Sequence, residues 1–210
     1  MKKRSFILLM GIFITFGVFA QLQENRYDEI TNPKLTCINK LPAHSSFFSF
    51  SNVAEAQKAL YSSKGSDFIS LDGTWKFNYA EDFSKRPMND FYNENFDASS
   101  WKDIKVPGNW EVQGFGYPIY VNTTYEFTSP GHEPFWNRPN PPYVPKEFNP
   151  TGTYRREFEI PQSWIGKEII LSADAAKGAA YYYLNGEFIG MNKAGKLPAR
   201  FDITAKVKAG

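Results

Sequence analysis

Residues that build disulfides and metal centres are scarce in this 210-residue chain. It has a single cysteine, Cys37, and only two histidines, His44 and His132. One cysteine cannot form a disulfide within the chain, so a packed core must stabilise the fold. A transition-metal centre built from several Cys and His ligands is excluded as well. We therefore expect no metal or other cofactor to bind to this chain.

A strong excess of charge of one sign is also missing. The chain has 24 Lys and Arg against 22 Asp and Glu. Three of the basic residues, Lys2, Lys3 and Arg4, precede an uncharged stretch at 5–20 that ends in Ala20. This stretch is shorter than the about 20 apolar residues that cross a bilayer, and its pattern is typical of a secretory signal peptide. We expect cleavage after Ala20 and export to the periplasm or the exterior.

Without this leader, the charge is 21 basic minus 22 acidic residues, or −1. No basic run remains in the rest of the sequence. Nucleic acid and anionic membrane surfaces are therefore not expected as partners.

Helical periodicity is rare. Residues 21–66 are irregular and interrupted by Pro33 and Pro42, and they allow one short helix. Ser51 or Asn52 can cap it, and Glu55 follows Asn52 by three residues. Apolar residues then recur at helical spacing: Val53, Ala56, Ala59 and Leu60. We interpret residues 21–66 as an arm with one short helix.

Short strands with turn signals dominate residues 67–210. Aromatic and polar residues alternate at 75–79, as expected for a strand with one buried face. Stretches 168–173 and 180–184 are rich in β-branched and aromatic residues. Asn185-Gly186 predicts a β-hairpin, because a type I′ turn needs positive φ at both central positions. The pattern indicates an all-β fold, an antiparallel β-sandwich of jelly-roll type.

One long connection, 128–150, carries seven prolines and is expected to lie extended on the sandwich surface. Aromatic residues are frequent from 110 to 143, where they could stack on sugar rings or pack in the core. They are Trp110, Tyr117, Tyr120, Tyr125, Phe127, Trp136 and Tyr143.

Five ordered motifs are more specific than the aromatic content. They are LDGTWKF at 71–77, VPGNWEVQGFGYPIYVNTTYEF at 106–127, NPTGTYRREFEIP at 149–161, YLNGEFIG at 183–190 and KLPARFDIT at 196–204. In order and spacing they resemble the N-terminal sugar-binding domain of glycoside hydrolase family 2 β-galactosidases. The first motif and the hairpin resemble the whole family, including β-glucuronidases and β-mannosidases. PIYVNTTY and NPTGTYRR resemble the galactosidase branch, although Glu126 stands where that branch usually has proline.

The resemblance implies that Asn122 contacts hydroxyls of a galactosyl ring and that Tyr120 lines the same pocket. An amide suits that task because it both donates and accepts hydrogen bonds. The alternative for Asn122 is a turn residue that binds its own backbone.

The resemblance also implies hydrolysis of terminal non-reducing β-D-galactose with retention, by two glutamates of a downstream barrel. On that basis we expect no catalytic residue in this chain, which would be truncated before the barrel and incomplete at the C-terminal end of its sugar-binding domain. It would be inactive alone. Magnesium, possibly with sodium, and an oligomeric assembly are implied for the full-length enzyme. There are two alternatives. The chain could be a free-standing carbohydrate-binding module, or it could be a subunit that complements a separately encoded remainder of the enzyme.

Glu157 and Glu159 share one face of an expected strand at 154–160. A pair of carboxylates could serve a glycosidase, but a solvated strand edge is the simpler interpretation.

Overall fold

The computed structural model describes residues 26–208 except 46, 60–64, 66, 88–89, 119–143 and 147–148. The chain divides into two compact units. The first comprises 1–36 and 140–144, and the second comprises 37–139 and 145–210. Every strand described below belongs to the second unit.

The first unit contains helix α2 (Arg26–Thr31), which the sequence pattern did not predict. Arg26 Nη1 forms an ion pair with Glu29 Oε1 at 3.2 Å, one helical turn away. Thr31 Oγ1 donates to the carbonyl of Asp28 at 3.2 Å. None of the six residues is buried, so the helix lacks the apolar periodicity by which a sequence reveals helices.

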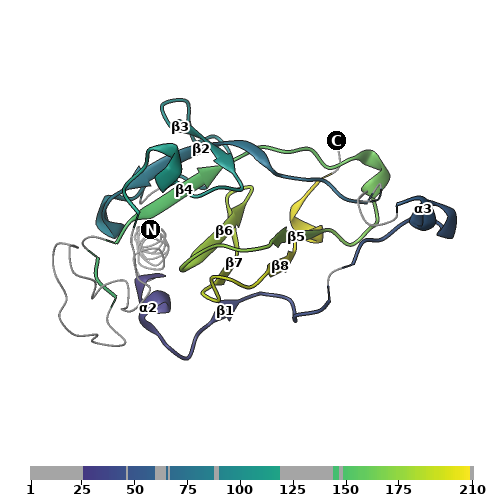
Figure 1. Ribbon diagram of the computed structural model, residues 1–210, viewed down its shortest axis with the longest axis horizontal. Coiled ribbons are helices and arrows are strands. Elements are labelled where there is room, and N and C mark those ends of the chain that lie inside the picture. Colours follow the sequence, from purple (N-terminus) through teal and green to yellow (C-terminus); the bar gives the residue numbers. More distant parts are fainter. Residues whose placement is uncertain are drawn as a thin grey trace, which may run out of the picture. The chain divides into compact units, whose positions relative to one another are not determined.

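The second unit is built from antiparallel strands (Figure 1). They are β1 (Cys37–Ile38), β2 (Gly73–Ala80), β3 (Lys102–Val106), β4 (Thr151–Arg155), β5 (Ile170–Ala173), β6 (Ala180–Leu184), β7 (Glu187–Asn192) and β8 (Ala199–Asp202). They form sheets in the orders β3-β2-β4, β1-β7-β6 and β5-β8. The predicted all-β antiparallel fold is confirmed, and its jelly-roll connectivity stays a prediction.

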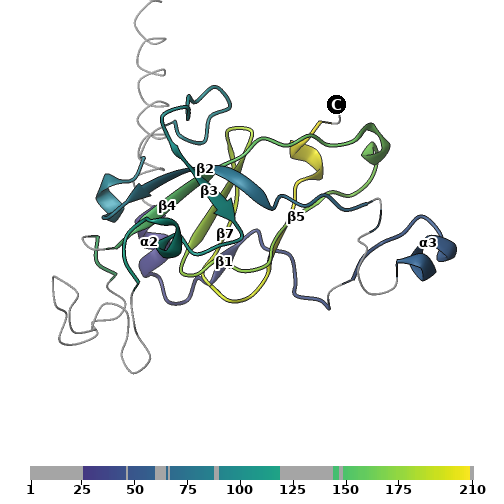
Figure 2. The ribbon, with the colours of Figure 1, turned by 45° about the horizontal axis from the view of Figure 1, so that its top comes forward.

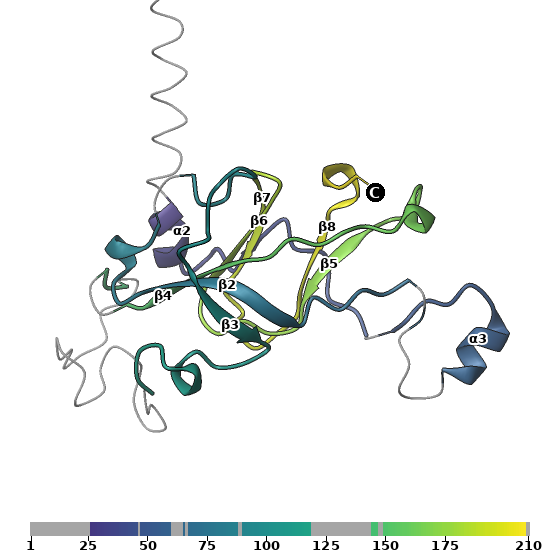
Figure 3. The same ribbon diagram turned by 90° about the horizontal axis from the view of Figure 1, so that it is seen from above.

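Figures 2 and 3 show the β3-β2-β4 sheet as one layer and the β1-β7-β6 sheet as another. Short helices lie between the strands, and one follows the last strand: α3 (Val53–Lys58), η1 (Phe83–Lys85), η2 (Glu111–Gln113), η4 (Gln162–Trp164) and, after β8, η5 (Thr204–Lys206). No helix within the described ranges has the length and apolar composition that crossing a bilayer requires.

The predicted hairpin is confirmed between β6 and β7, which pair in an antiparallel register. Asn185 has φ 50° and Gly186 has φ 81°, as a type I′ turn requires. Asn185 Nδ2 also donates to the carbonyl of Lys206 at 2.9 Å, which ties the turn to η5.

The predicted short helix is confirmed as α3. The backbone N–H of Glu55 donates to Asn52 Oδ1 at 2.9 Å, and Asn52 Nδ2 donates to Glu55 Oε1 at 3.2 Å. Both partners of the expected cap therefore interact. The helix ends at Lys58, so Ala59 lies beyond it.

The expected strand at 154–160 is wrong in its bounds, because β4 ends at Arg155. Burial still alternates beyond that point: Phe158 and Ile160 are at least partly buried, while Glu157 and Glu159 are exposed. Successive side chains of an extended backbone point to opposite sides, so burial alternates with a period of two. This alternation shows which side chains face the core, and it occurs whether or not the segment pairs with a neighbouring strand. The solvated interpretation of the two glutamates is confirmed.

The arm also contributes to a sheet. Cys37 and Ile38 form β1, which pairs with β7. Cys37 is a free cysteine. A buried cluster of apolar residues from β7, β8 and the segments beside β5 forms the main core: Ile160, Ile169, Ile189, Ala199, Phe201 and Ile203.

Candidate functional site

The two predicted sugar contacts, Tyr120 and Asn122, lie outside the described residues, as do Tyr125, Phe127, Trp136 and Tyr143. The structure does describe the chain on both sides of the 119–143 stretch. We therefore describe the residues on either side of this stretch. The segment before it is called the entry, and the segment after it is called the exit.

The entry segment, 107–118, follows β3 through a cis Val106–Pro107 peptide and contains η2. Its anchor is Gln113, whose Oε1 accepts from the Lys105 N–H at 2.7 Å and whose Nε2 donates to the Lys105 carbonyl at 3.0 Å. The side-chain amide thus binds the backbone of Lys105 as a neighbouring strand would. A Cβ on Gly108 would lie 2.7 Å from Gln113 Nε2, so glycine makes room for this contact.

Aromatic rings from the entry segment pack on β2 and β4. Phe77, which is 1% exposed, has its ring centroid 4.7 Å from Phe115 and 4.6 Å from Tyr154. Trp110 lies 6.0 Å from Phe77 and 5.7 Å from Tyr79. These five residues are called the aromatic layer below. Trp110 packs against the buried Phe77 and is itself only partly buried, whereas Tyr117 is 56% exposed.

A glycine of β4 makes this packing possible. A Cβ on Gly152 would lie 2.5 Å from Trp110 Cζ3 and 2.7 Å from Phe77 Cε2. Any larger residue would push the rings off the strand, because real Cβ atoms do not approach so closely. Gly152 belongs to the NPTGTYRR motif and Trp110 to the VPGNW motif, so the two motifs meet in space.

The two tyrosines of the layer are held neutral. Burial raises the pKa of Tyr154 to about 12, and the nearby Glu111 carboxylate adds to this effect. Burial also raises the pKa of Tyr79, with Glu81 the next contributor. Neutral phenols pack as apolar rings and can still donate a hydrogen bond.

The exit is held against η1. Pro145 is fully buried, and its carbonyl accepts from Asn149 Nδ2 at 2.8 Å. The carbonyl of Lys146 accepts from the Phe83 N–H at 2.9 Å. Pro145 and Lys146, which follow this stretch in the sequence, are therefore held by contacts within the second unit.

Metal ligands and acidic side chains are the groups through which the described residues could take part in bond cleavage. Among the described residues, no group of three or more His, Cys, Asp or Glu could hold a metal ion, so they do not fit the magnesium that the sequence resemblance implies. Hydrogen bonds from the Ser99 backbone lower the pKa of Asp97, and those from the Thr204 hydroxyl lower the pKa of Asp202. A general acid needs the opposite shift.

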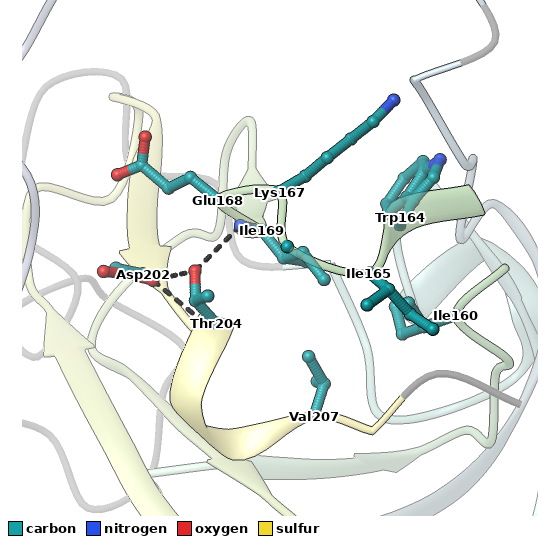
Figure 4. A pocket seen from close by; sticks show the side chains of 10 residues that line it. Ile160, Trp164, Ile165, Lys167, Glu168, Ile169, Asp202, Thr204 and Val207 are labelled. Carbon is teal, nitrogen blue, oxygen red and sulfur yellow. Dashed lines mark hydrogen bonds between the residues drawn. The ribbon is translucent and has the colours of Figure 1, made fainter. Parts of the chain in front are cut away.

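An apolar hollow of about 450 Å³ lies between η4 and η5 (Figure 4). Its apolar lining is Ile160, Trp164, Ile165, Ile169 and Val207. The hydroxyl of Thr204 accepts from the Ile169 N–H at 2.9 Å and donates to Asp202 Oδ1 at 2.6 Å. Because these polar groups already bind one another, the apolar hollow is poorly suited to a polyhydroxylated ligand.

Sequence reasoning singled out the motifs but missed Gln113 and Gly152. Two local signals were available in the sequence. Gln113 lies between β3 and a glycine-rich turn, and Gly152 is a glycine inside a strand. Neither reveals its partner without the fold.

Residues 68–210 match the model of the glycosyl hydrolases family 2, sugar binding domain. Beta-galactosidase of Lactobacillus delbrueckii subsp. bulgaricus is 38% identical over 192 residues, which are 89% of this chain and 18% of that protein. Beta-galactosidase of Halalkalibacterium halodurans is 40% identical over 167 residues, 80% of this chain and 16% of that protein. The chain thus spans less than a fifth of the length of these relatives.

The beta-galactosidase large subunit of Leuconostoc lactis is 34% identical over 192 residues, 85% of this chain and 29% of that subunit. Among solved structures, Bacteroides uniformis beta-glucuronidase is 26% identical with a TM-score of 0.44, covering 67% of this chain and 13% of that one.

Proposed function

We propose that this chain, which belongs to glycosyl hydrolase family 2 through its sugar binding domain, is the substrate-positioning part of a β-galactosidase. The observation that carries this proposal is the match of residues 68–210 to that domain, together with beta-galactosidase relatives at 38% and 40% identity. The full reaction would be hydrolysis of terminal non-reducing β-D-galactose with retention, which needs two carboxyl groups about 5 to 5.5 Å apart.

Asn122 and Tyr120 are our proposed contacts to the galactosyl ring. The contacts of Gln113, Gly152 and Pro145 support this role, because they fix described backbone that precedes and follows the stretch in the sequence. A sugar-binding side chain must be held close to its productive position, and a rigid base serves that purpose.

The direct test uses a chimera. This chain replaces the matching part of the Lactobacillus delbrueckii beta-galactosidase, and Asn122→Ala is introduced. We expect kcat/KM for a chromogenic β-galactoside to fall at least tenfold, since a lost hydrogen bond costs about 1 kcal/mol and an unpaired buried group costs more. Asn95→Ala, at an exposed position of the β2–β3 connection, is the matched control. Equal activity of the two variants would refute the role of Asn122.

By itself the chain is proposed to be inactive, because it spans less than a fifth of the length of its beta-galactosidase relatives. The purified 210-residue chain should show no turnover of the same galactoside. Turnover above background would contradict this account.

We also propose export through the leader at 1–20. In a secreting bacterial host, the mature protein should begin at Gln21 and leave the cytoplasm. N-terminal sequencing of fractionated cells checks this, and an intact Met1 in the cytoplasmic fraction would refute it.

A further inference from the structure

A second hollow, of about 570 Å³, lies on the β3-β2-β4 sheet. Lys76 and Arg155 line it from neighbouring strands, and the segment 96–99 forms its wall. Glu157 lies just beyond the end of β4. We call this site the polar hollow. It differs from the apolar hollow in presenting charged and hydroxyl groups.

The polar hollow has fixed walls. The guanidinium of Arg155 donates to the carbonyls of Asn93 at 2.8 Å and Glu94 at 2.7 Å, which ties the segment before the wall to β4. Arg156 Nη1 donates to the carbonyl of Leu71 at 2.9 Å, and its guanidinium lies 5.9 Å from the Trp75 ring centroid. Ordered walls lower the entropic cost of binding a ligand.

The formal charges of the described residues that line the polar hollow cancel. Three cations, Lys76, Arg155 and Arg156, face three carboxylates, Asp97, Asp103 and Glu157. Only Lys76 and Asp103 form an ion pair, at 2.9 Å, among these described side chains. A ligand with a net charge would therefore gain little, whereas a neutral ligand with many donors and acceptors could use both kinds of group.

Two carboxylates are available to such a ligand. Asp97 Oδ1 accepts from the Ser99 N–H at 2.8 Å, which holds the exposed carboxylate in place. Glu157 is exposed and forms no ion pair or hydrogen bond with any described residue. Phe96 adds an apolar surface, of the kind on which the C–H groups of sugar rings pack.

We propose that the polar hollow binds a neutral saccharide of one or two pyranose units. Sugar hydroxyls both donate and accept, so they can bind the carboxylates of Asp97 and Glu157 as well as the ammonium group of Lys76. The volume of about 570 Å³ falls within the range of small-molecule sites. This site goes beyond the proposed function, because the described residues that line it lie at 74–76, 96–99, 103 and 155–157.

The test is a titration of the ¹⁵N-labelled 210-residue chain with methyl β-D-galactopyranoside and with lactose, followed by amide chemical shifts. We expect saturable shifts at 74–76, 96–99 and 155–157. The double variant Asp97→Asn, Glu157→Gln should weaken binding at least tenfold. The amide oxygen that this variant carries at position 97 can still accept from Ser99, so the wall is preserved. Glu159→Gln, exposed on the same segment, is the control and should bind within twofold of the parent.

Two further experiments separate binding at the polar hollow from binding at Asn122 and from binding of charged ligands. Asn122→Ala should leave the shifts in the polar hollow unchanged, whether or not Asn122 contacts substrate. Glycylglycine, a zwitterion, should bind more weakly than either sugar. Absence of sugar-dependent shifts in these residues, an unaffected double variant in a well-dispersed spectrum, or tighter binding of glycylglycine would each overturn the proposal.

Discussion

The aromatic layer and the apolar hollow are both built from large apolar side chains, but the aromatic layer is closed around a fully buried ring, whereas the apolar hollow is open. Phe77 is 1% exposed at the centre of the layer, with rings on three sides. Around the apolar hollow, Ile160 and Ile169 are buried, yet they border a space of about 450 Å³ and Ile165 is 69% exposed. Closure at the layer depends on glycine, because Gly152 lets Trp110 lie directly on β4.

This difference shows where the fold is rigid. The layer joins residues from β2, β4 and the entry segment, so a change at one of them disturbs the others. The apolar hollow has room in which neighbouring side chains can adjust. The closed region includes Trp110 and Phe115 of the entry segment.

The largest effect is expected from Phe77→Ala. Emptying the centre of the layer should lower the free energy of unfolding by about 3–5 kcal/mol, through lost burial and a cavity. Trp164→Ala, in the lining of the apolar hollow, should cost less than half as much because its ring is only partly buried. Urea denaturation followed by circular dichroism measures both. Equal losses would refute the contrast between the two regions.

Gly152→Ala should come next, with a loss of about 1–3 kcal/mol from overpacking against Trp110 and Phe77. Thr153→Ala, the next residue of β4 and directed to the other face, is the matched control. We expect the control to lose clearly less in the same denaturation experiment. A neutral Gly152→Ala would mean that the Trp110 ring can move away freely.

These contacts mark the limit of what the sequence predicted. The hairpin at Asn185-Gly186 and the cap of α3 by Asn52 were predictable because each depends on neighbours within a few residues. The packing of Gly152 against Trp110 joins residues about forty positions apart, and no local pattern encodes it.

Boundaries were harder to predict than elements. The strand expected to run to Ile160 ends at Arg155, since alternating burial continues where pairing stops. In the candidate site, the motifs led to the correct family, but Gln113 had no local signal that names Lys105 as its partner. The roles of Asn122 and Tyr120 stay predictions.

A smaller effect is expected at high pH. The pKa of Tyr154 is raised to about 12 from 10.0, so the folded state keeps its proton where the unfolded state loses it. Stability is therefore full below pH 10 and falls as the pH rises from 10 towards 12. Because Tyr154 is 40% exposed, water screens part of this effect. Urea midpoints across this range should fall less steeply in Tyr154→Phe, and parallel curves would contradict the assignment.

The smallest change in stability, within about 0.5 kcal/mol, is expected for Ile165→Asp, since this side chain is 69% exposed. Its effect should instead appear in the binding of an apolar fluorescent dye such as anilinonaphthalene sulfonate. An open apolar space can admit such a dye, whereas the closed layer cannot, so Ile165→Asp should reduce the fluorescence enhancement. Val112→Asp, 80% exposed beside the aromatic layer, introduces the same charge where no apolar hollow is described. If both variants lowered dye fluorescence equally, the added charge alone would explain the loss, and the apolar hollow would not be the open space that distinguishes the two regions.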